Sequence, residues 1–416
     1  MRKLHYSWII LSITFFSIIV AGIVRSSSGV FVIPFEEEFG WSRANISLSF
    51  GVSLFLYGIS GPFMGAIVQI IGLRKMMLIS MGTLMVGLVM TYFMQETWQL
   101  LVIWGGLIGL GSALFLTVLS PIIANRWFVK KRGLAVGILT ASTATGQLIL
   151  LPVLAFINDT YSWRIAILLI LLLSVGMFVV IGLFMKNTPE EVGVVPYGGS
   201  ATEDTALPMT GKNPFKLAVL PLLEALKIKE FWLLAGSFFI CGLSTSGLIG
   251  THFIAYCIGF GFAAVTAASL LSLMGIFDLV GTTLSGWLSD RIDNRWLLFW
   301  YYLLRGLSLL LLPMALSEGS IGLLFMFAIF YGLDWIATVP PTINISRQVF
   351  GLQKSVIIYG WIFAAHQAGA AVASFGGGIA FEMASSYTAA FLGAGAMCFL
   401  ASLFVMVIKK DKNGLA

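Results

Sequence analysis

The sequence predicts an all-α membrane protein with twelve transmembrane helices arranged as two pseudo-symmetric bundles of six. Three observations lead to this fold class: twelve long apolar runs, basic residues concentrated on one side of them, and an internal repeat. Of 416 residues, 59% are hydrophobic and 10% are charged, against roughly 25% charged in an average soluble domain. A soluble fold of this length would leave much of its apolar content in water, whereas lipid-facing helix surfaces are apolar.

Each of the twelve apolar runs is long enough to cross a hydrocarbon core of roughly 30 Å. They lie near 7–31, 46–71, 75–94, 98–125, 131–157, 163–185, 230–256, 265–289, 295–316, 320–346, 355–379 and 387–408. The first run is too long for a signal peptide, contains Arg25 and has no clear cleavage site, so we expect a permanent span.

Basic residues set the orientation of these spans. Of the 24 lysines and arginines, 20 fall on the side where the chain begins, and the opposite loops hold Arg43 and Arg164. The 20 are Arg2, Lys3, Arg74, Lys75, Arg126, Lys130, Lys131, Arg132, Lys186, Lys212, Lys216, Lys227, Lys229, Arg291, Arg295, Arg347, Lys354, Lys409, Lys410 and Lys412. The positive-inside rule places both termini in the cytoplasm, and we expect a bacterial inner membrane. The net charge of +6 is thus a topology signal, and no nucleic-acid partner is expected.

A polar stretch divides the chain into two parts. We expect a six-helix bundle over 1–186, a cytoplasmic linker over 187–229 and a second six-helix bundle over 230–416. One offset of 221 residues relates the parts: it separates Phe39-Gly40 from Phe260-Gly261, Gly65 from Gly286, Gly111 from Gly332, and Arg126 from Arg347. Parallel repeats of this kind are one architecture for alternating access, the mechanism of secondary transporters.

The loop after the eighth span resembles a motif of the major facilitator superfamily. The run is Gly286-Trp287-Leu288-Ser289-Asp290-Arg291, followed by Arg295. The resemblance implies that the aspartate pairs with basic residues and latches the halves in one state. We therefore expect gating roles for Asp290 and Arg291, and for the basic residues that follow the fourth and tenth spans, Arg126 and Arg347. In the first-half copy Gln69 replaces the family's aspartate.

A narrower resemblance follows the fourth span. The segment 125–137, Asn-Arg-Trp-Phe-Val-Lys-Lys-Arg-Gly-Leu-Ala-Val-Gly, resembles the signature of monocarboxylate transporters and the oxalate/formate antiporter group. The segments 359–366 and 375–378 are similar to the latter group too. The resemblance implies a small organic anion carried with a proton or in exchange. It places His366 where relatives have a substrate-binding lysine, and Thr282 where they have an anion-binding arginine.

Ionisable side chains inside the spans cost roughly 2.5–3.5 kcal/mol on insertion scales and are functional candidates. They are Arg25, Asp278, Arg305, Asp334 and His366. Arg25, among serines 26–28, can hold a carboxylate through two parallel hydrogen bonds, or it can be a helix-packing arginine that extends toward the membrane surface.

The two aspartates, Asp278 and Asp334, are candidates for proton coupling, and the alternative for either is a fixed ion pair with Arg305. His366 can bind an anion when it is protonated, and Gln367 lies beside it. The predicted substrate-binding set is therefore Arg25, His366, Gln367 and Thr282.

The sequence has no phosphate-binding loop, no Cys/His cluster with metal-ligand spacing and no nucleophile elbow, so we expect neither an enzyme nor a cofactor or metal. The leading hypothesis is a monomeric secondary transporter of a small organic anion, a monocarboxylate, coupled to protons. The alternative is a drug or neutral-solute exporter, which the loss of the cation at Thr282 and the aromatic content favour.

Overall fold

The computed structural model describes residues 5–199 and 213–409, and nearly all of them are helical. The first six membrane-length segments comprise α1 (Tyr6–Ser26) with α2 (Ser28–Phe39), α3 (Arg43–Ile71), α4 (Leu73–Phe93), α5 (Thr97–Leu100) with the π-helix η1 (Leu101–Ile108), α6 (Gly109–Thr117) and α7 (Leu119–Trp127), α8 (Arg132–Thr160) and α9 (Trp163–Phe184). The last six comprise α11 (Lys229–Gly242) with the π-helix η3 (Leu243–Ile249) and α12 (Gly250–Gly259), α13 (Ala264–Ser289), α14 (Asn294–Ser317), α15 (Ile321–Asp334) with α16 (Val339–Phe350), α17 (Leu352–Ala384) and α18 (Thr388–Val407).

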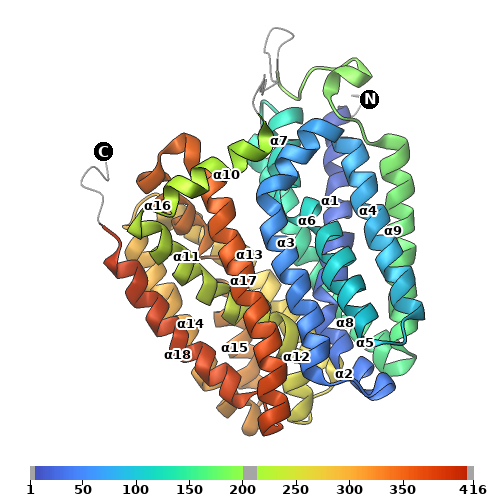
Figure 1. The fold of residues 1–416 in the computed structure, drawn as a ribbon, viewed down its shortest axis with the longest axis vertical. Coiled ribbons are helices and arrows are strands. Elements are labelled where there is room, and N and C mark those ends of the chain that lie inside the picture. The colour runs from blue at the N-terminus through green and yellow to red at the C-terminus, as the bar shows by residue number, and fades with distance from the viewer. Residues whose placement is uncertain (1–4, 200–212, 410–416) are drawn as a thin grey trace.

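These segments form two bundles of six, the first half (α1–α9) and the second half (α11–α18), which stand side by side (Figure 1). Eleven of the segments are long and apolar enough to cross a membrane, and the 29-residue helix α8 occupies the fifth position. The predicted all-α membrane fold is confirmed. Most predicted spans end within about five residues of the observed helices; the exception is the first, which continues to Phe39.

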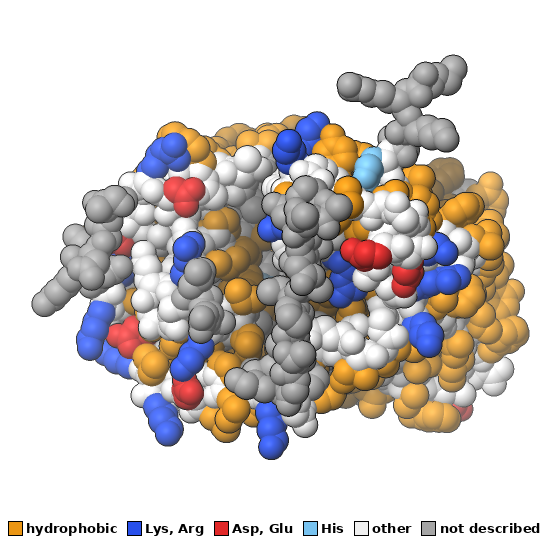
Figure 2. Space-filling view, turned by 90° about the horizontal axis from the view of Figure 1, so that it is seen from above, with side chains coloured by type: hydrophobic (Ala, Val, Ile, Leu, Met, Phe, Trp, Pro, Cys, Tyr) orange, Lys and Arg blue, Asp and Glu red, His pale blue; other side chains and the backbone are white. Residues whose placement is uncertain are grey.

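Both ends of the described chain lie on one side of the bundles, which we call the terminal side (Figure 1). Figure 2 views this side and shows lysine and arginine side chains over both halves. Five of the predicted basic residues, Arg2, Lys3, Lys212, Lys410 and Lys412, lie outside the described residues.

The helix ends follow from local chemistry. Ser42, Ser162 and Ser320 precede α3, α9 and α15, and each side chain accepts a hydrogen bond from a backbone N–H of the first turn, which satisfies a donor that the helix leaves free. Gly40 and Gly261, the repeat landmarks, both end helical segments with positive φ, 65° and 85°, a conformation that glycine adopts without strain.

Two segments are interrupted at equivalent places in the halves. In the fourth segment α6 ends at Thr117 and α7 begins at Leu119; in the tenth, α15 ends at Asp334 and α16 begins at Val339. Pro340 and Pro341 lie in the first turn of α16, where a missing N–H costs nothing. Backbone groups at such breaks need partners from elsewhere.

The halves meet along α3 with α17 and along α8 with α13. Glycines allow this approach: a Cβ on Gly51 would lie 2.8 Å from the carbonyl oxygen of Ala371, and one on Gly29 would lie 2.8 Å from that of Gly250. Small residues bring membrane helices into such close contact.

The segment between the halves holds a short 3-10 helix, η2 (Pro189–Val192), and the helix α10 (Pro214–Ala225). The helix α10 crosses the terminal side and packs on both α3 and α17 (Figure 1). Its contacts include Phe215 with Phe63, at 5.9 Å between ring centroids, and a 2.9 Å hydrogen bond from the Trp361 indole to the carbonyl of Ala218.

Candidate functional site

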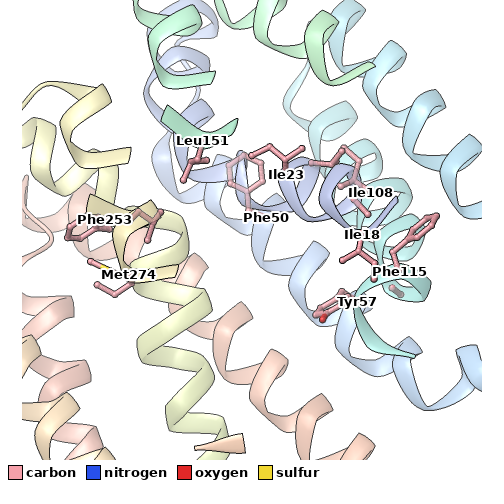
Figure 3. Close-up of a cluster of buried hydrophobic side chains, with 14 of the residues drawn as sticks. Ile18, Ile23, Phe50, Tyr57, Ile108, Phe115, Leu151, Phe253 and Met274 are labelled. Carbon is pink, nitrogen blue, oxygen red and sulfur yellow. The ribbon is translucent and has the colours of Figure 1, made fainter. Parts of the chain in front are cut away.

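A cavity of about 690 Å³ lies between the two halves. Its lining residues come from α1, α3, α6, α7 and α8 of the first half and from α11, η3, α12, α13 and α17 of the second, with Ser28 at the start of α2 and residues 335–339 at the break between α15 and α16. Ile18, Tyr57 and Phe115, which lie close together in Figure 3, are at once part of the apolar interior of the first half and of this lining. A concave site of this size is typical of ligand pockets.

The cavity extends toward the terminal side. Its lining reaches Pro121 in α7 and Val136 and Gly137 near the start of α8. A Cβ on Gly137 or on Gly286, near the end of α13, would meet no atom within 4 Å. The space around these two glycines is therefore open, whereas α3 and α17 remain in contact through Phe63 and Trp361, with ring centroids 5.7 Å apart.

On the opposite side the halves are joined by a cluster around Arg43, the first residue of α3. Its guanidinium lies 2.6 Å from the Glu36 carboxylate, 3.3 Å from the Tyr387 hydroxyl and 3.6 Å from the centre of the Phe381 ring. The neighbouring backbone N–H of Ala44 donates to the Glu382 carboxylate at 2.8 Å. Phe381, Glu382 and Tyr387 belong to the second half, so these contacts close that end.

Arg25 lies near the end of α1, on the boundary between the halves. Its Nη2 donates to the Ser246 hydroxyl of η3 at 3.3 Å, and its guanidinium lies 4.9 Å from the centre of the Tyr57 ring. Its Nε is buried without a hydrogen-bond partner. Among the described residues Arg25 is the only lysine or arginine that lines the cavity, and no ion pair between them includes it. It therefore has donors available for an anion.

His366 and Gln367 lie on α17 and line the same cavity. The imidazole of His366 stacks on Phe363, with centroids 5.6 Å apart and planes 9° apart, and its Nε2 lies 3.5 Å from the Thr245 hydroxyl. The Gln367 amide lies 3.3 Å from His366 Nδ1, and its Oε1 is buried without a partner. The helix passes very close to α11 here, since a Cβ on Gly242 would overlap the His366 carbonyl oxygen at 1.7 Å.

Asp278 lies on α13, faces the cavity and is 6% exposed. Its Oδ1 accepts hydrogen bonds from the Thr282 hydroxyl and from the backbone N–H of Ile336, each 2.9 Å long. Ile336 lies in the break between α15 and α16, so the carboxylate satisfies a backbone donor that the interrupted helix leaves free. Asp278 thus connects α13 to the break, and Thr282 supports it from one turn away.

Of the two candidate aspartates, Asp334 is the one that forms the ion pair with Arg305. The Arg305 Nε lies 2.5 Å from Asp334 Oδ2, and Nη2 donates to the Asp334 carbonyl at 2.6 Å and to the Trp335 carbonyl at 3.3 Å. Nη1 lies 2.7 Å from the Cys241 sulfur. Arg305 is 1% exposed and, like Asp334, is absent from the cavity lining. Arg305 therefore supplies hydrogen-bond donors for the backbone carbonyls of Asp334 and Trp335 at the helix break.

The predicted gating residues lie on the terminal side, away from the cavity. Asp290 directly follows α13 and is exposed; Arg291 folds back over Trp287, with its guanidinium 4.2 Å from the centre of the indole ring. None of the ion pairs given for the described residues involves Asp290. Arg347 is exposed near the end of α16. The predicted gating role of these residues stays a prediction.

Arg126 contacts the start of the linker instead of the other half. Its Nη1 donates to the Asn187 carbonyl at 3.3 Å, and Asn187 donates twice to the Glu191 carboxylate, at 3.0 and 2.8 Å. Burial alone would raise the pKa of Glu191, but the hydrogen bonds from Asn187 and the nearby charges of Lys186 and Arg74 together hold that pKa below its usual value. Asn187 Oδ1 also accepts from the Arg74 backbone N–H at 3.0 Å.

Several polar residues of the site were missed from the sequence. Ser246 and Tyr57 both contact Arg25, yet neither is ionisable inside the membrane at neutral pH. The repeat was the available signal: 25 plus 221 is 246, and 278 minus 221 is 57, so Ser246 and Tyr57 are the symmetry mates of Arg25 and Asp278. Outside the cavity lining, the intramembrane histidine His252 in α12 was also missed; it is fully buried, and its Nε2 lies 2.7 Å from the Ser374 carbonyl.

Among the described residues no group of three or more His, Cys, Asp or Glu side chains is placed to hold a metal ion. The lining is instead a set of hydroxyls and amides around one cation and one carboxylate, with aromatic rings between them. Such a set can bind a polar or anionic organic solute through hydrogen bonds and ring contacts.

Comparison with known proteins places these features in context. The family model of the Major Facilitator Superfamily matches residues 14–374. Monocarboxylate transporter 13 of Rattus norvegicus is 27% identical over 405 residues, which cover 95% of this chain and 87% of the relative. The uncharacterized MFS-type transporter YcxA of Bacillus subtilis is 26% identical over 387 residues, 91% of this chain and 90% of the relative.

Among solved structures, a partially occluded inward open conformation of the xylose transporter XylE from E. coli superimposes with a TM-score of 0.72. The match covers 99% of this chain and 100% of that chain at 14% sequence identity. A likeness at this identity concerns the fold, and it agrees with the two bundles described above.

Proposed function

The chain belongs to the major facilitator superfamily of transporters, and from this premise we propose that it is a secondary transporter that moves a small organic anion, a monocarboxylate, by alternating access with proton coupling. One observation carries the proposal. Arg25 is the single lysine or arginine of the cavity lining, it has no carboxylate partner among the described residues, and it contacts both halves. The monocarboxylate transporters among the relatives support the choice of anion.

The mechanism follows from the geometry. An anion that enters from the terminal side replaces the weak contact between Arg25 and Ser246 with charge-assisted hydrogen bonds, which are roughly twice as strong as neutral ones. Because Arg25 and Ser246 belong to different halves, the bound anion draws the halves together at the cavity. The contacts around Arg43 on the opposite side must then separate for release there.

We assign proton coupling to Asp278. As a carboxylate it holds the Ile336 N–H and the Thr282 hydroxyl. Protonation removes the charge that strengthens these hydrogen bonds, which loosens α13 from the break between α15 and α16. The pairing of Asp334 with Arg305 favours a structural role for that aspartate, and its part in proton coupling stays a prediction.

His366, Gln367 and Thr282 remain the proposed substrate ligands beside Arg25, because all of them line the cavity. We propose that the protein acts as a monomer in the bacterial inner membrane with cytoplasmic termini, since one chain completes the cavity and its basic residues gather on the terminal side. No cofactor is required by this mechanism.

The experiment is uptake of labelled carboxylates into proteoliposomes under an imposed pH gradient. We expect uptake of at least one monocarboxylate that is faster with the gradient than without it. A panel of carboxylates with no gradient-dependent uptake by correctly oriented protein would contradict the proposal.

A second function, export of a drug or neutral solute, is favoured by one observation: the cavity is far larger than a two- or three-carbon acid requires. Resistance profiling of a deletion strain separates the two, because loss of a monocarboxylate transporter leaves drug tolerance unchanged.

A further inference from the structure

One wall of the cavity is a continuous row of rings, which we call the aromatic row: Tyr57, Phe363, His366, Phe238 and Tyr359. The Tyr57 and Phe363 centroids are 5.8 Å apart, edge to face, and His366 stacks on Phe363 at 5.6 Å. The row continues to Phe238, 4.8 Å from His366, and on to Tyr359, 6.1 Å further. It joins α3 of one half to α11 and α17 of the other.

The cation of the cavity lies at one end of this row. The Arg25 guanidinium is 4.9 Å from the centre of the Tyr57 ring, and its buried Nε has no partner. The acidic and imidazole groups of the lining are Asp278, whose carboxylate already accepts two hydrogen bonds, and His366, which is part of the row. The lining therefore offers one site for a single negative charge, next to ring surfaces.

Ring surfaces in this arrangement favour an aromatic ligand over a saturated one. Aromatic pairs at centroid separations of 4.5–7 Å are more stable than their buried area alone explains. The two-carbon and three-carbon acids have no ring that could pair with these surfaces. A cavity of about 690 Å³ has room for a ring between the arginine and the row.

We propose that the substrate is an aromatic monocarboxylate, whose carboxylate binds Arg25 and Ser246 while its ring packs along Tyr57 and Phe363. The proposal rests on the proposed function, because it names the class of anion that the cavity takes. A dicarboxylate fits less well, since its second charge would have no cation in the lining.

The test uses three probes that differ in one property each: benzoate, cyclohexanecarboxylate and benzyl alcohol. Dissociation constants are measured by calorimetry on the purified full-length protein in detergent. We expect benzoate to bind roughly 2- to 12-fold more tightly than cyclohexanecarboxylate, the factor that an aromatic pair contributes. Benzyl alcohol is expected to bind at least roughly 10-fold more weakly than benzoate, because it cannot form charge-assisted hydrogen bonds.

A substitution tests whether the preference for an aromatic ring depends on Phe363. Phe363→Leu keeps an apolar side chain but removes the ring, so the ratio of benzoate affinity to cyclohexanecarboxylate affinity is expected to fall to about one. The control is Phe330→Leu on α15, where the ring is 60% exposed on the outer surface and absent from the lining; its ratio is expected to equal that of the wild type. The wild-type probe series decides the proposal even if Phe363→Leu does not fold.

The outcomes separate this inference from the proposed function. Equal affinity for benzoate and cyclohexanecarboxylate overturns the aromatic substrate and leaves anion transport standing. Benzyl alcohol binding as tightly as benzoate overturns both, as does a lack of binding by every carboxylate.

Discussion

Replacing Asp334 by asparagine is expected to destabilise the fold while leaving proton-driven transport measurable. The change keeps the shape of the side chain and removes its charge, so the guanidinium of Arg305 remains buried without its counter-ion. This perturbation tests whether the pair is structural, as its geometry indicates, or takes part in proton coupling.

The magnitude follows from the contacts of Arg305. Breaking a buried ion pair by removing one partner costs about 3–5 kcal/mol. In Asp334→Asn the hydrogen bonds to two backbone carbonyls and to the Cys241 sulfur persist, so we expect the lower end, about 3 kcal/mol. Arg305→Leu removes all of these donors and strands the carboxylate, so we expect about 5 kcal/mol. The double variant with Asp334→Leu should cost less than the sum of the single changes, because neither charge is then left alone.

The assay is reversible denaturant unfolding of purified protein in mixed micelles, with gradient-driven uptake measured on the same preparations. The control is Glu224→Gln, which removes the charged partner of Lys354 in a pair whose side chains are 58% and 52% exposed. The free energy of unfolding of this variant is expected to fall by no more than about 1 kcal/mol. If Asp334→Asn unfolded with the stability of the wild type and lost gradient-driven uptake, the structural interpretation would be refuted.

Three further changes test other parts of the structure. Asp278→Asn cannot take up a proton, so we expect gradient-driven uptake to fall at least roughly tenfold while substrate exchange at equal pH continues; unchanged gradient-driven uptake would contradict this assignment. Gly281→Ala places a Cβ 1.8 Å from a backbone oxygen of α15, so we expect a loss of stability of about 1–3 kcal/mol. Gly286→Ala, whose Cβ would meet no atom within 4 Å, should change the stability by no more than about 0.5 kcal/mol. Thermal unfolding of both variants measures the difference, and equal losses of stability would refute the close packing at Gly281. Arg43→Gln removes contacts that close the side opposite the termini. In the Ser374→Cys background, Arg43→Gln should make the introduced cysteine react roughly tenfold faster with an impermeant maleimide. An unchanged rate would show that the contacts of Arg43 do not hold the halves together.

The fold could be predicted closely because its physical signals are local. Apolar runs of membrane length end at charged or polar residues, and the predicted ends agree with the helices to within a few residues at most positions. The first span was predicted too short because the helix continues beyond the apolar run, through Glu36, Glu37 and Glu38. In the structure Glu36 pairs with Arg43, and Glu38 accepts from the Trp163 indole and pairs with Arg164.

The site could be predicted in part. Ionisable residues inside a bilayer almost always face the protein interior, and three of them, Arg25, Asp278 and His366, line one cavity. The partner of Arg305 could not be read from the sequence, because both aspartates lie on helices that contact α14, which carries Arg305. Asp278 is on α13 and Asp334 ends α15. Only the three-dimensional position of the break after α15 brings Asp334 within 2.5 Å of the guanidinium.

The central claim, that Arg25 binds a substrate anion, is tested most directly by uptake of a labelled monocarboxylate in proteoliposomes that contain wild type or Arg25→Lys. Both proteins are matched for the amount inserted. Lysine keeps the charge but loses the paired donors and the contact with Tyr57, and a charge-assisted hydrogen bond contributes about 1.5–3 kcal/mol. The account predicts a KM at least roughly 10-fold higher for Arg25→Lys, with an unchanged amount of folded protein. Uptake with wild-type KM and maximal rate would contradict it and assign Arg25 to helix packing.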